Sequence, residues 1–449
     1  MNLVNRAKKY AKQMVLAERY IWNNAEVGYK EYKTDAYMKK AFKDLGYEIK
    51  EAGDITGFSA EIDTGREGPT LALLAELDAL YCSSHPETNK ETGAVHACGH
   101  NVQCASIIGV ASALMEEGAL DNLSGKIRFI IVPAEEGVEI AYRYELIKSG
   151  KISFISGKPE MIKRGFFDGV DIAYMVHTAN LVAKGNPAFH ISYGGSNGNI
   201  KKRIIIKGKS AHAGGRPSDG INALNAQSLI TNAVNYLRET FKEEDKVRFH
   251  NIITEGGASV NVVPDRVVME CYVRASNIKA LIKTNTKINR AIACAVASIG
   301  ADVEIIDIPG SEPVKNDKTL ADITVKVAKD IAGENDCSTT CYQGGSSTDM
   351  GDVSTIFPSL HAYVGGVEGI AHGKDYRIVD SEKICVNSAS LQLGVVEELL
   401  KDGAKKAKEV IKNSNVEFKS IEEYLKHKES IRKVFNPVEI VGNGVKIKI

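Results

Sequence analysis

The sequence has no excess charge of either sign, because its 449 residues include 57 Lys and Arg against 57 Asp and Glu. A protein dedicated to nucleic acids usually carries a basic excess, so this balance argues against that class. Long hydrophobic runs are also lacking. The most apolar stretch, residues 105–115, is interrupted by small residues and is too short to cross a bilayer. The N-terminal residues predict an amphipathic helix rather than a signal peptide, so we expect neither nucleic acid nor membrane among the partners.

Cysteine is sparse as well, with eight residues scattered through the chain and no paired spacing. This excludes a disulfide scaffold and favours reduced thiols in a cytoplasmic protein. Hydrophobic residues make up 43% and charged residues 25% of the chain, which is ordinary for a globular protein. The length indicates two or more lobes.

Strand and helix patterns alternate along the first part of the chain. Strand-like runs occupy residues 57–63, 70–77, 125–133 and 170–177, and helical periodicity is found at 2–22, 34–46 and 102–117. The run 125–133 is almost continuously apolar, as in a strand covered on both faces. The alternation predicts an α/β domain with a central, mainly parallel sheet flanked by helices.

The middle of the chain has a different order of elements. Strand-like and helical patterns follow one another at 186–208, 219–242, 247–255, 263–274, 277–299 and 301–308. This order is close to a split βαβ sandwich and predicts an inserted, ferredoxin-like α+β lid domain. Helices near 317–333 and 381–412 then resume the α/β pattern, and the Lys/Glu-rich remainder predicts a solvated, partly ordered extension. The predicted main domain consists of two parts, at 1–188 and 308–412. The inserted lid domain spans 189–307, and the C-terminal extension spans 413–449.

Two short motifs offer side chains that can bind metal. Cys98 and His100 lie two apart, so in an extended segment both would face one ion, and thiolate and imidazole suit zinc. An isolated pair of this kind is more often a buried cysteine beside a structural histidine. Glu135 and Glu136 follow the apolar strand, where one carboxylate could bind metal and its neighbour take a proton from water. An acidic helix N-terminus explains the two glutamates about equally well.

Further polar residues follow other predicted strands. His177 ends one strand, and His372 lies in a late loop; each alone is more often a satisfied histidine than a ligand. Glu76 and Asp78 end another strand, where a carboxylate can orient a ligating histidine, or simply mark the strand boundary. The carboxyl ends of strands converge at one edge of an open α/β sheet, so these side chains could share one site.

The inserted domain carries its own candidates. His212 lies among small residues, and Arg274 could bind a carboxylate through its fork of donors, with Asn261 nearby in sequence. A turn-rich loop and a surface arginine are the simpler interpretation of these residues. The Gly/Ser loop at 344–352 lacks the GK[ST] of a phosphate cradle and is interpreted as a wall of the site.

In this order, the pieces HACGHN, PAEEG and SSTDMGDVS resemble the aminoacylase/carboxypeptidase superfamily, the M-twenty metallopeptidases. The sequence looks most like the amidohydrolase branch, and within it the p-aminobenzoyl-glutamate hydrolase and dipeptidase subgroup. The resemblance spans about residues 15–400. Two departures are GHNVQ, where many branch members have GHDxH, and extra residues at about 143–168, which we expect to reshape the pocket rim.

The resemblance implies a role for each candidate. The residues that match the branch's metal ligands are Cys98, His100, Glu136, His177 and His372. Glu135 matches its general base, and His212 matches a histidine of the lid that reaches the partner subunit's active site. Asn261 and Arg274 match residues that hold the substrate's carboxylate. Glu76 and Asp78 match an H-x-D position, at which Asp78 contacts and orients the metal ligands without binding the metal.

The resemblance therefore implies a homodimeric, metal-dependent amidohydrolase of N-acyl amino acids or dipeptides, with a metal-activated water and a glutamate base. Two divalent ions per subunit are expected, zinc or manganese, with nickel and cobalt as alternatives. A strict p-aminobenzoyl-glutamate hydrolase and a β-alanyl dipeptidase are the other enzymatic hypotheses. A catalytically silent binding protein is disfavoured because all of the ligands and the base are present.

Overall fold

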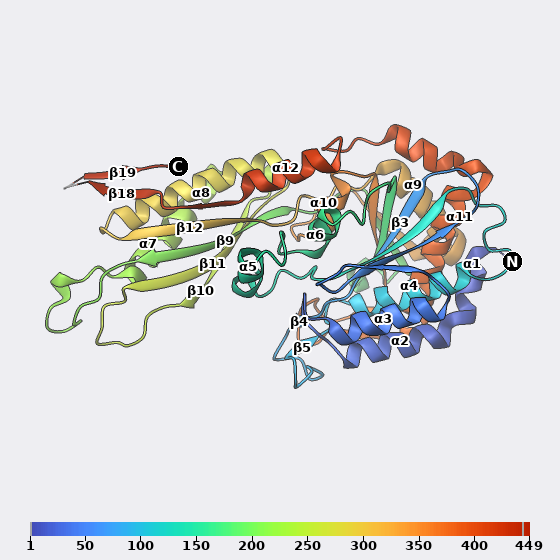
Figure 1. The fold of residues 1–449 in the computed structure, drawn as a ribbon, viewed down its shortest axis with the longest axis horizontal. Helices are drawn as coiled ribbons and strands as arrows, with labels where there is room; N and C mark the ends of the chain where they lie inside the picture. The colour runs from blue at the N-terminus through green and yellow to red at the C-terminus, as the bar shows by residue number, and fades with distance from the viewer. Residues whose placement is uncertain (1, 442–443) are drawn as a thin grey trace.

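The computed structural model describes residues 2–441 and 444–449. Two bodies, each built around its own large sheet, lie along the long axis of the molecule (Figure 1). The body that contains the N-terminus is the main α/β domain, and the elongated body beyond it is the lid. Within the described chain no helix has both the length and the apolarity needed to cross a membrane.

The main domain is built on an eight-stranded sheet. Its order across the sheet is β1 (Ile49–Glu51), β2 (Phe58–Asp63), β6 (Lys126–Val132), β3 (Thr70–Glu76), β7 (Ile172–Thr178), β14 (Ser359–Val364), β8 (Phe189–Ser192) and β13 (Cys337–Thr340). The central strands β6, β3, β7 and β14 run parallel. All seven residues of β3 are buried, as expected for a strand covered on both faces. The predicted α/β fold with a mainly parallel sheet is confirmed.

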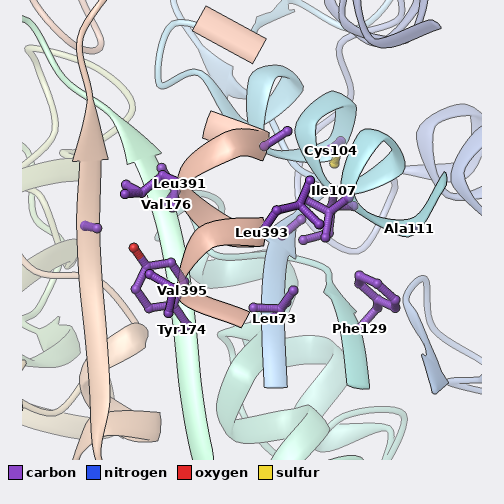
Figure 2. Packing of buried hydrophobic residues seen from close by; sticks show 14 of the residues in the cluster. Leu73, Cys104, Ile107, Ala111, Phe129, Tyr174, Val176, Leu391, Leu393 and Val395 are labelled. Carbon is purple, nitrogen blue, oxygen red and sulfur yellow. The ribbon is translucent and has the colours of Figure 1, made fainter. Parts of the chain in front are cut away.

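Helices cover both faces of this sheet. The face bearing Leu71 and Leu73 packs against α2, α4, α9 and α11, whose bounds are Ala11–Asn23, His100–Leu114, Lys318–Ala332 and Ser381–Asn413. Figure 2 shows Leu73 of β3 and Tyr174 of β7 in one cluster with Ile107 of α4 and Leu393 of α11, the last two side by side. The alternate residues Ala72 and Leu74 face α6 (Gly157–Lys163) and α10 (Met350–Ser354). Every side chain of α4 is buried, so this helix lies in the centre of the domain.

The remaining short elements border this core. They are α1 (Leu3–Arg6), α3 (Tyr32–Asp44), α5 (Ile140–Lys148), and the two-residue strands β4 (Leu80–Tyr81), β5 (Ala94–Val95), β15 (Val367–Glu368) and β16 (Arg377–Ile378). The predicted helix at 2–22 is divided by a 3₁₀ turn, and α11 is interrupted by non-helical backbone at Lys401–Ala404. The extra residues near 143–168 form α5 and α6.

The lid is built on an antiparallel sheet with helices on one face. Its order is β10 (Arg248–Glu255), β11 (Arg266–Ala275), β9 (Gly198–Lys207), β12 (Asp302–Pro309) and β17 (Lys433–Phe435). Ile204 and Met269 project from the covered face into a second core beneath α7 (Ala223–Tyr236) and α8 (Ile278–Ala297). The ferredoxin-like arrangement of the inserted segment is thus present, whereas the domain boundaries at 188/189 and 307/308 stay a prediction.

The C-terminal segment differs from the solvated extension that its composition predicts. α12 (Ile421–Ile431) packs on the molecule, β17 adds to the lid sheet beside β12, and β18 (Val438–Val441) pairs with β19 (Gly444–Ile447). Phe418 and Tyr424 join the core of the main domain. The segment therefore contacts both bodies, and the prediction of a solvated tail is wrong for this part of the chain.

A buried lysine explains how such a polar segment can be packed. Lys428 is fully buried and its Nζ lies 2.6 Å from Asp352 Oδ1 and 3.3 Å from Glu312 Oε1, while it also donates to the Gly310 carbonyl. The Tyr424 hydroxyl donates to the same Asp352 oxygen at 2.7 Å. Because the partners of Lys428 come from the end of the lid sheet and from α10, α12 ties the two bodies together.

Lys428→Ala would leave Asp352 and Glu312 buried without their cation. Breaking a buried ion pair from one side costs about 3–5 kcal/mol, so the free energy of unfolding should fall by that amount. Lys426→Ala on the same helix is the matched control, because this lysine is exposed and should change stability by less than about 0.5 kcal/mol. Urea titration followed by circular dichroism measures both variants. Equal midpoints for Lys428→Ala and the unsubstituted protein would contradict the role of this lysine.

Candidate metal centre

The polar residues of the predicted site meet at the carboxyl edge of the central strands. Glu76 is the last residue of β3, Glu135 and Glu136 follow β6, and His177 is the penultimate residue of β7. These strands are neighbours in the sheet, so their ends lie together. Open α/β sheets usually bind their ligands at this edge.

The first turn of α4 brings Cys98 and His100 to the same edge. The turn depends on Gly99, which has φ +88°, a conformation that L side chains rarely adopt. A Cβ at this position would lie 2.2 Å from Thr178 Oγ1 and 2.5 Å from the Tyr376 hydroxyl. Glycine therefore allows the chain to pass close to β7 and presents both side chains to the site.

Strained backbone flanks two of the other donors. Ala134 has φ 54° immediately before Glu135, and His372 itself has φ 65°. Left-handed conformations are uncommon for residues other than glycine and tend to occur at functional sites. Ala134 is held by its N–H, which donates to Glu31 Oε1 at 2.7 Å, and by its carbonyl, which accepts from Gly157 N at 3.1 Å. The chain thus turns sharply just where the paired glutamates are needed.

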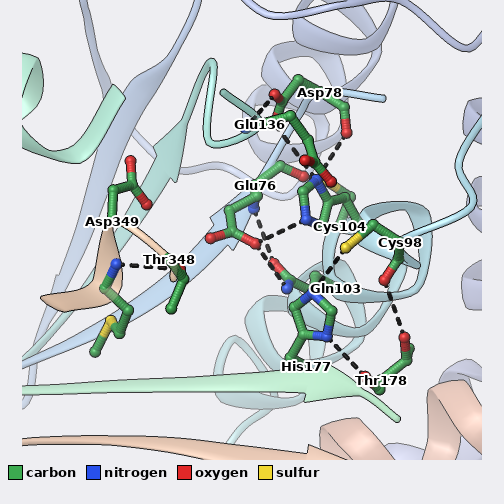
Figure 3. Close-up of polar contacts among 12 residues, drawn as sticks. Glu76, Asp78, Cys98, Gln103, Cys104, Glu136, His177, Thr178, Thr348 and Asp349 are labelled. Atoms are coloured by element: carbon green, nitrogen blue, oxygen red, sulfur yellow. Dashed lines mark hydrogen bonds and ion pairs between the residues drawn. The ribbon is translucent and has the colours of Figure 1, made fainter. Parts of the chain in front are cut away.

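The structure brings together all five predicted ligands and the predicted base. Four groups among the described residues have ligand atoms within 4.8 Å of one another: Cys98 with His100 and His177, Cys98 with Glu136 and His372, His100 with Glu135 and Glu136, and Glu76 with Glu135 and Asp349. Cys98 Sγ lies 3.4 Å from His177 Nε2, and His372 Nε2 lies 3.2 Å from Glu136 Oε1 (Figure 3 shows the side chains around Cys98). Since Cys98 belongs to two of the groups, its sulfur stands between two sets of donors.

The atoms in this cluster fit a divalent metal. His100 Nε2 and Glu136 Oε1 are buried, and neither makes a well-aligned hydrogen bond in the described part of the chain, although each lies within 3.2 Å of a polar atom of another residue of the site, Glu76 Oε2 and His372 Nε2 respectively. Buried polar atoms are rarely left in this state without an ion or water. A thiol, imidazoles and a carboxylate are the donors that zinc and similar borderline ions prefer.

Backbone carbonyl groups orient two of the imidazoles. His100 Nδ1 lies 2.7 Å from the Asp78 carbonyl oxygen, and His177 Nδ1 lies 2.7 Å from that of Thr178. Each contact leaves Nε2 directed into the site, as in metal centres in which the second nitrogen is hydrogen-bonded. Asp78 also accepts the Glu136 N–H at 2.9 Å, so this residue supports two donors.

Electrostatics favours the thiolate form of Cys98 and a strongly basic Glu135. Burial and the Glu136 carboxylate raise the pKa of Cys98, but the His177 and His100 imidazoles outweigh them and lower that pKa to about 6. Burial, together with Glu76 and Glu136, holds the pKa of Glu135 well above its usual range. A carboxylate with a raised pKa is a stronger base, which suits a residue that accepts a proton.

A buried ion-pair triad beneath the cluster was not predicted from the sequence. Lys158 Nζ lies 2.5 Å from Asp349 Oδ1 and also contacts Glu76 Oε1, and all three side chains are buried. Glu76 Oε2 in turn lies 3.1 Å from His100 Nε2. The segment with Lys158 was expected at the pocket rim, and the loop with Asp349 only as a wall. The one local signal is the lysine's position between Gly157 and Pro159 at the start of a helix.

The lid residues divide into two groups. Arg274 Nη1 donates to Ser347 Oγ at 2.8 Å, so this arginine reaches the loop that carries Asp349. His212 and Asn261 are exposed on neighbouring lid loops, joined by the Ala213 N–H, which donates to the Asn261 carbonyl at 2.9 Å. No hydrogen bond or ion pair among the described residues links these two side chains to the metal cluster.

Comparisons with known proteins agree with this site. N-acetyl-L-cysteine deacetylase from Bacillus subtilis is 29% identical over 69% of this chain and 70% of its own. Xaa-Arg dipeptidase from Mus musculus is 26% identical over 83% of this chain and 81% of its own.

Two solved structures share the fold at low identity. An aminobenzoyl-glutamate utilization protein from Klebsiella pneumoniae superposes with a TM-score of 0.67 at 19% identity, covering 90% of this chain and all of that one. A Bacillus subtilis protein described as a dinuclear metal-binding peptidase has a TM-score of 0.63 at 23% identity, covering 87% and 98%.

The model of peptidase family M20/M25/M40 matches residues 72–398, which is more than half of the chain and includes every residue of the donor cluster. The resemblance seen in the sequence is therefore confirmed. With its strand-end cluster of thiol, imidazole and carboxylate donors, the chain belongs to peptidase family M20/M25/M40 and is a metal-dependent amidohydrolase or peptidase.

Proposed function

We propose that this protein hydrolyses the amide bond of N-acyl amino acids or dipeptides, using two divalent ions held by Cys98 and its neighbours. The observation that carries the proposal is the convergence of five donor side chains around one carboxylate of raised pKa, Glu135. Relatives named for deacetylation of an acyl amino acid and for a dipeptidase activity support this substrate class.

The proposed metal ligands are Cys98, His100, Glu136, His177 and His372. Zinc or manganese is the proposed metal, with nickel and cobalt as alternatives. A divalent ion bound here supplies Lewis-acid polarisation of the amide carbonyl and lowers the pKa of water. Sharing of Cys98 between two donor groups supports two ions per subunit.

Glu135 is the proposed general base. Its carboxylate accepts a proton from the attacking water and then delivers that proton to the nitrogen of the leaving amine. The residue keeps some solvent exposure, while the burial of its carboxyl group and the neighbouring carboxylates keep its proton affinity high. Lys158 and Asp349 hold Glu76 in place, and Glu76 in turn contacts His100.

Arg274 is proposed to bind the carboxylate of the amino-acid portion, beside Ser347. Asn261 is proposed to hold the substrate's carboxylate end as well, and its loop is bonded to that of His212. His212 is proposed to act in the site of a second subunit, where it would donate to the developing oxyanion.

The lid sheet supports a homodimer about a two-fold axis. In the described chain β17 covers part of β12, whereas β10 forms the other edge of the sheet without a partner. Ile252 and Ile253 are exposed on β10, as is Tyr236 at the end of α7. Open apolar edge strands are usually covered by another strand, and a second copy of β10 would do this symmetrically.

Removal of a proposed ligand should remove metal and activity together. Cys98→Ala and Glu136→Ala each delete one donor, so bound metal and turnover should fall in parallel. Cys337→Ala is the control, because this cysteine belongs to none of the donor groups. Elemental analysis of the purified variants tests the prediction. Full metal content in both ligand variants would exclude them from the ligand set.

Glu135→Gln separates the base from the ligands. Because Glu136 is unchanged, the variant should retain metal and bind a substrate analogue, while its turnover falls by at least about 10²-fold. Glu139→Gln, four residues along, partly buried and paired with Lys30 outside the donor groups, should leave turnover nearly unchanged. Single-turnover kinetics and metal analysis distinguish the outcomes. Near-normal turnover with intact metal would show that another group takes the proton.

Mixed dimers test the action of His212 in the partner's site. His212→Ala and Glu135→Gln homodimers should each be nearly inactive. In a co-expressed heterodimer, one site combines an intact Glu135 with an intact His212 from the other chain, so activity should return to at most about half of the unsubstituted level. Purification through two different affinity tags isolates the heterodimer. An inactive heterodimer would mean that His212 does not act across the interface.

A further inference from the structure

One face of the lid sheet is turned towards the metal centre. Residues alternate along β9 and β11, so that Ile200 and Val273 pack under the helices while Lys201, Tyr272 and Arg274 project from the opposite face. The Tyr272 hydroxyl donates to the carbonyl of Gly137, the residue that follows the proposed ligand Glu136. This hydrogen bond fixes the lid face against the site.

Lys201 lies close to the same loop. A Cβ added to Gly137 would come within 2.9 Å of Lys201 Nζ, and Glu135 and Asp349 are near enough to act on the lysine's charge. Only 2% of the residue is exposed. The ammonium group therefore lies beside the loop that follows Glu136, with little access to bulk water.

Lys201 differs from the other buried lysines in having no partner. Lys158, Lys202 and Lys428 each form an ion pair with a buried aspartate. Within residues 2–441 and 444–449, no hydrogen bond or ion pair is formed by Lys201 Nζ, whose nearest favourable contact is the Tyr272 ring at 5.5 Å. A buried charge is costly unless it is paired. Burial lowers the pKa of Lys201 to about 7, which reflects the same lack of a counter-ion.

The second cation on this face, Arg274, lies on β11, the strand paired with the β9 strand of Lys201. Tyr272 is directly opposite Lys201, and Arg274 lies two residues further along β11, with its guanidinium 5.3 Å from the centre of the Tyr272 ring. The acid in this row, Glu270, is opposite Arg203 and forms an ion pair with neither cation. Lys201 and Arg274 thus approach one aromatic ring and offer two separate contacts to anions.

We propose that Lys201 is a specificity-determining residue that binds a second carboxylate of the substrate, so that the enzyme prefers N-acyl derivatives of acidic amino acids. Arg274 takes the α-carboxylate and Lys201 takes the side-chain carboxylate, with Tyr272 between them. The inference rests on the proposed function for the reaction and for the contact at Arg274. Beyond the proposed function, it specifies that the site selects amino acids with a negatively charged side chain.

Matched substrates and variants test this assignment. The metal-loaded enzyme is assayed with N-acetyl-glutamate and with its neutral isostere N-acetyl-glutamine. Lys201→Met should lower kcat/KM for the glutamate derivative by roughly 10- to 100-fold, mainly through KM, because a charge-assisted hydrogen bond is lost. For the glutamine derivative the loss should stay below about 3-fold. Lys207→Met, on the same strand but at its exposed end, is the control and should change neither value.

A binding measurement separates this inference from the proposed reaction. Glutarate should bind the metal-loaded, unsubstituted protein at least about tenfold more tightly than Lys201→Met by titration calorimetry. Hydrolysis of both substrates without any preference for glutamate, or an equal loss on both in Lys201→Met, would overturn the role of Lys201 and leave the proposed function intact. Failure to hydrolyse any acyl amino acid, with Lys201-dependent glutarate binding, would instead overturn the proposed function alone.

Discussion

Carboxylates gathered at one buried sheet edge are the constraint on which the rest of this structure depends. Burial of a charge without a partner costs several kcal/mol, so each carboxylate requires compensation. Glu76 receives Lys158 and His100, and Glu136 faces His372. The thiol and imidazoles around these groups complete a donor set whose remaining unsatisfied atoms point to metal. The strained turn at Ala134 and the glycine before α4 follow from the same need, because both bring donors to this edge.

The face of the lid sheet that contacts the main domain carries charges of the opposite kind. The main domain supplies carboxylates, imidazoles and a thiol, whereas the face of the lid sheet supplies Lys201 and Arg274. Tyr272 fixes this face to the loop after Glu136, and Arg274 contacts the loop that carries Asp349. The position of the lid is further determined by α12, whose Lys428 contacts groups at the junction of the two bodies. Several buried polar contacts thus hold the two bodies in a fixed arrangement.

The sequence predicted the parts of this site that are encoded locally. Strand ends followed by polar residues made Glu135, Glu136 and His177 candidates, as the short spacing did for Cys98 and His100, but only the resemblance to a known family gave these residues their roles. Ion pairs between distant segments give no such signal, so Lys158 looked like part of a rim. The tail was wrongly expected to be solvated because a helix with a lysine on its buried side has the composition of a surface helix. In each case, the partner that makes burial favourable lies more than 70 residues away.

In the described chain, one edge of the lid sheet is partly covered and the other edge is open to a second subunit. β17 occupies part of β12, so extension of the sheet by another chain is left to β10. The loop that follows β10 carries Asn261, and its backbone is bonded to the loop of His212. A two-fold contact along β10 would carry both loops with it, because they are linked to each other and to this edge. The cations at Lys201 and Arg274 lie on the same sheet within one chain. One lid would therefore serve two sites, recognising the charge of its own substrate while its distal loops act on the substrate of the neighbouring subunit.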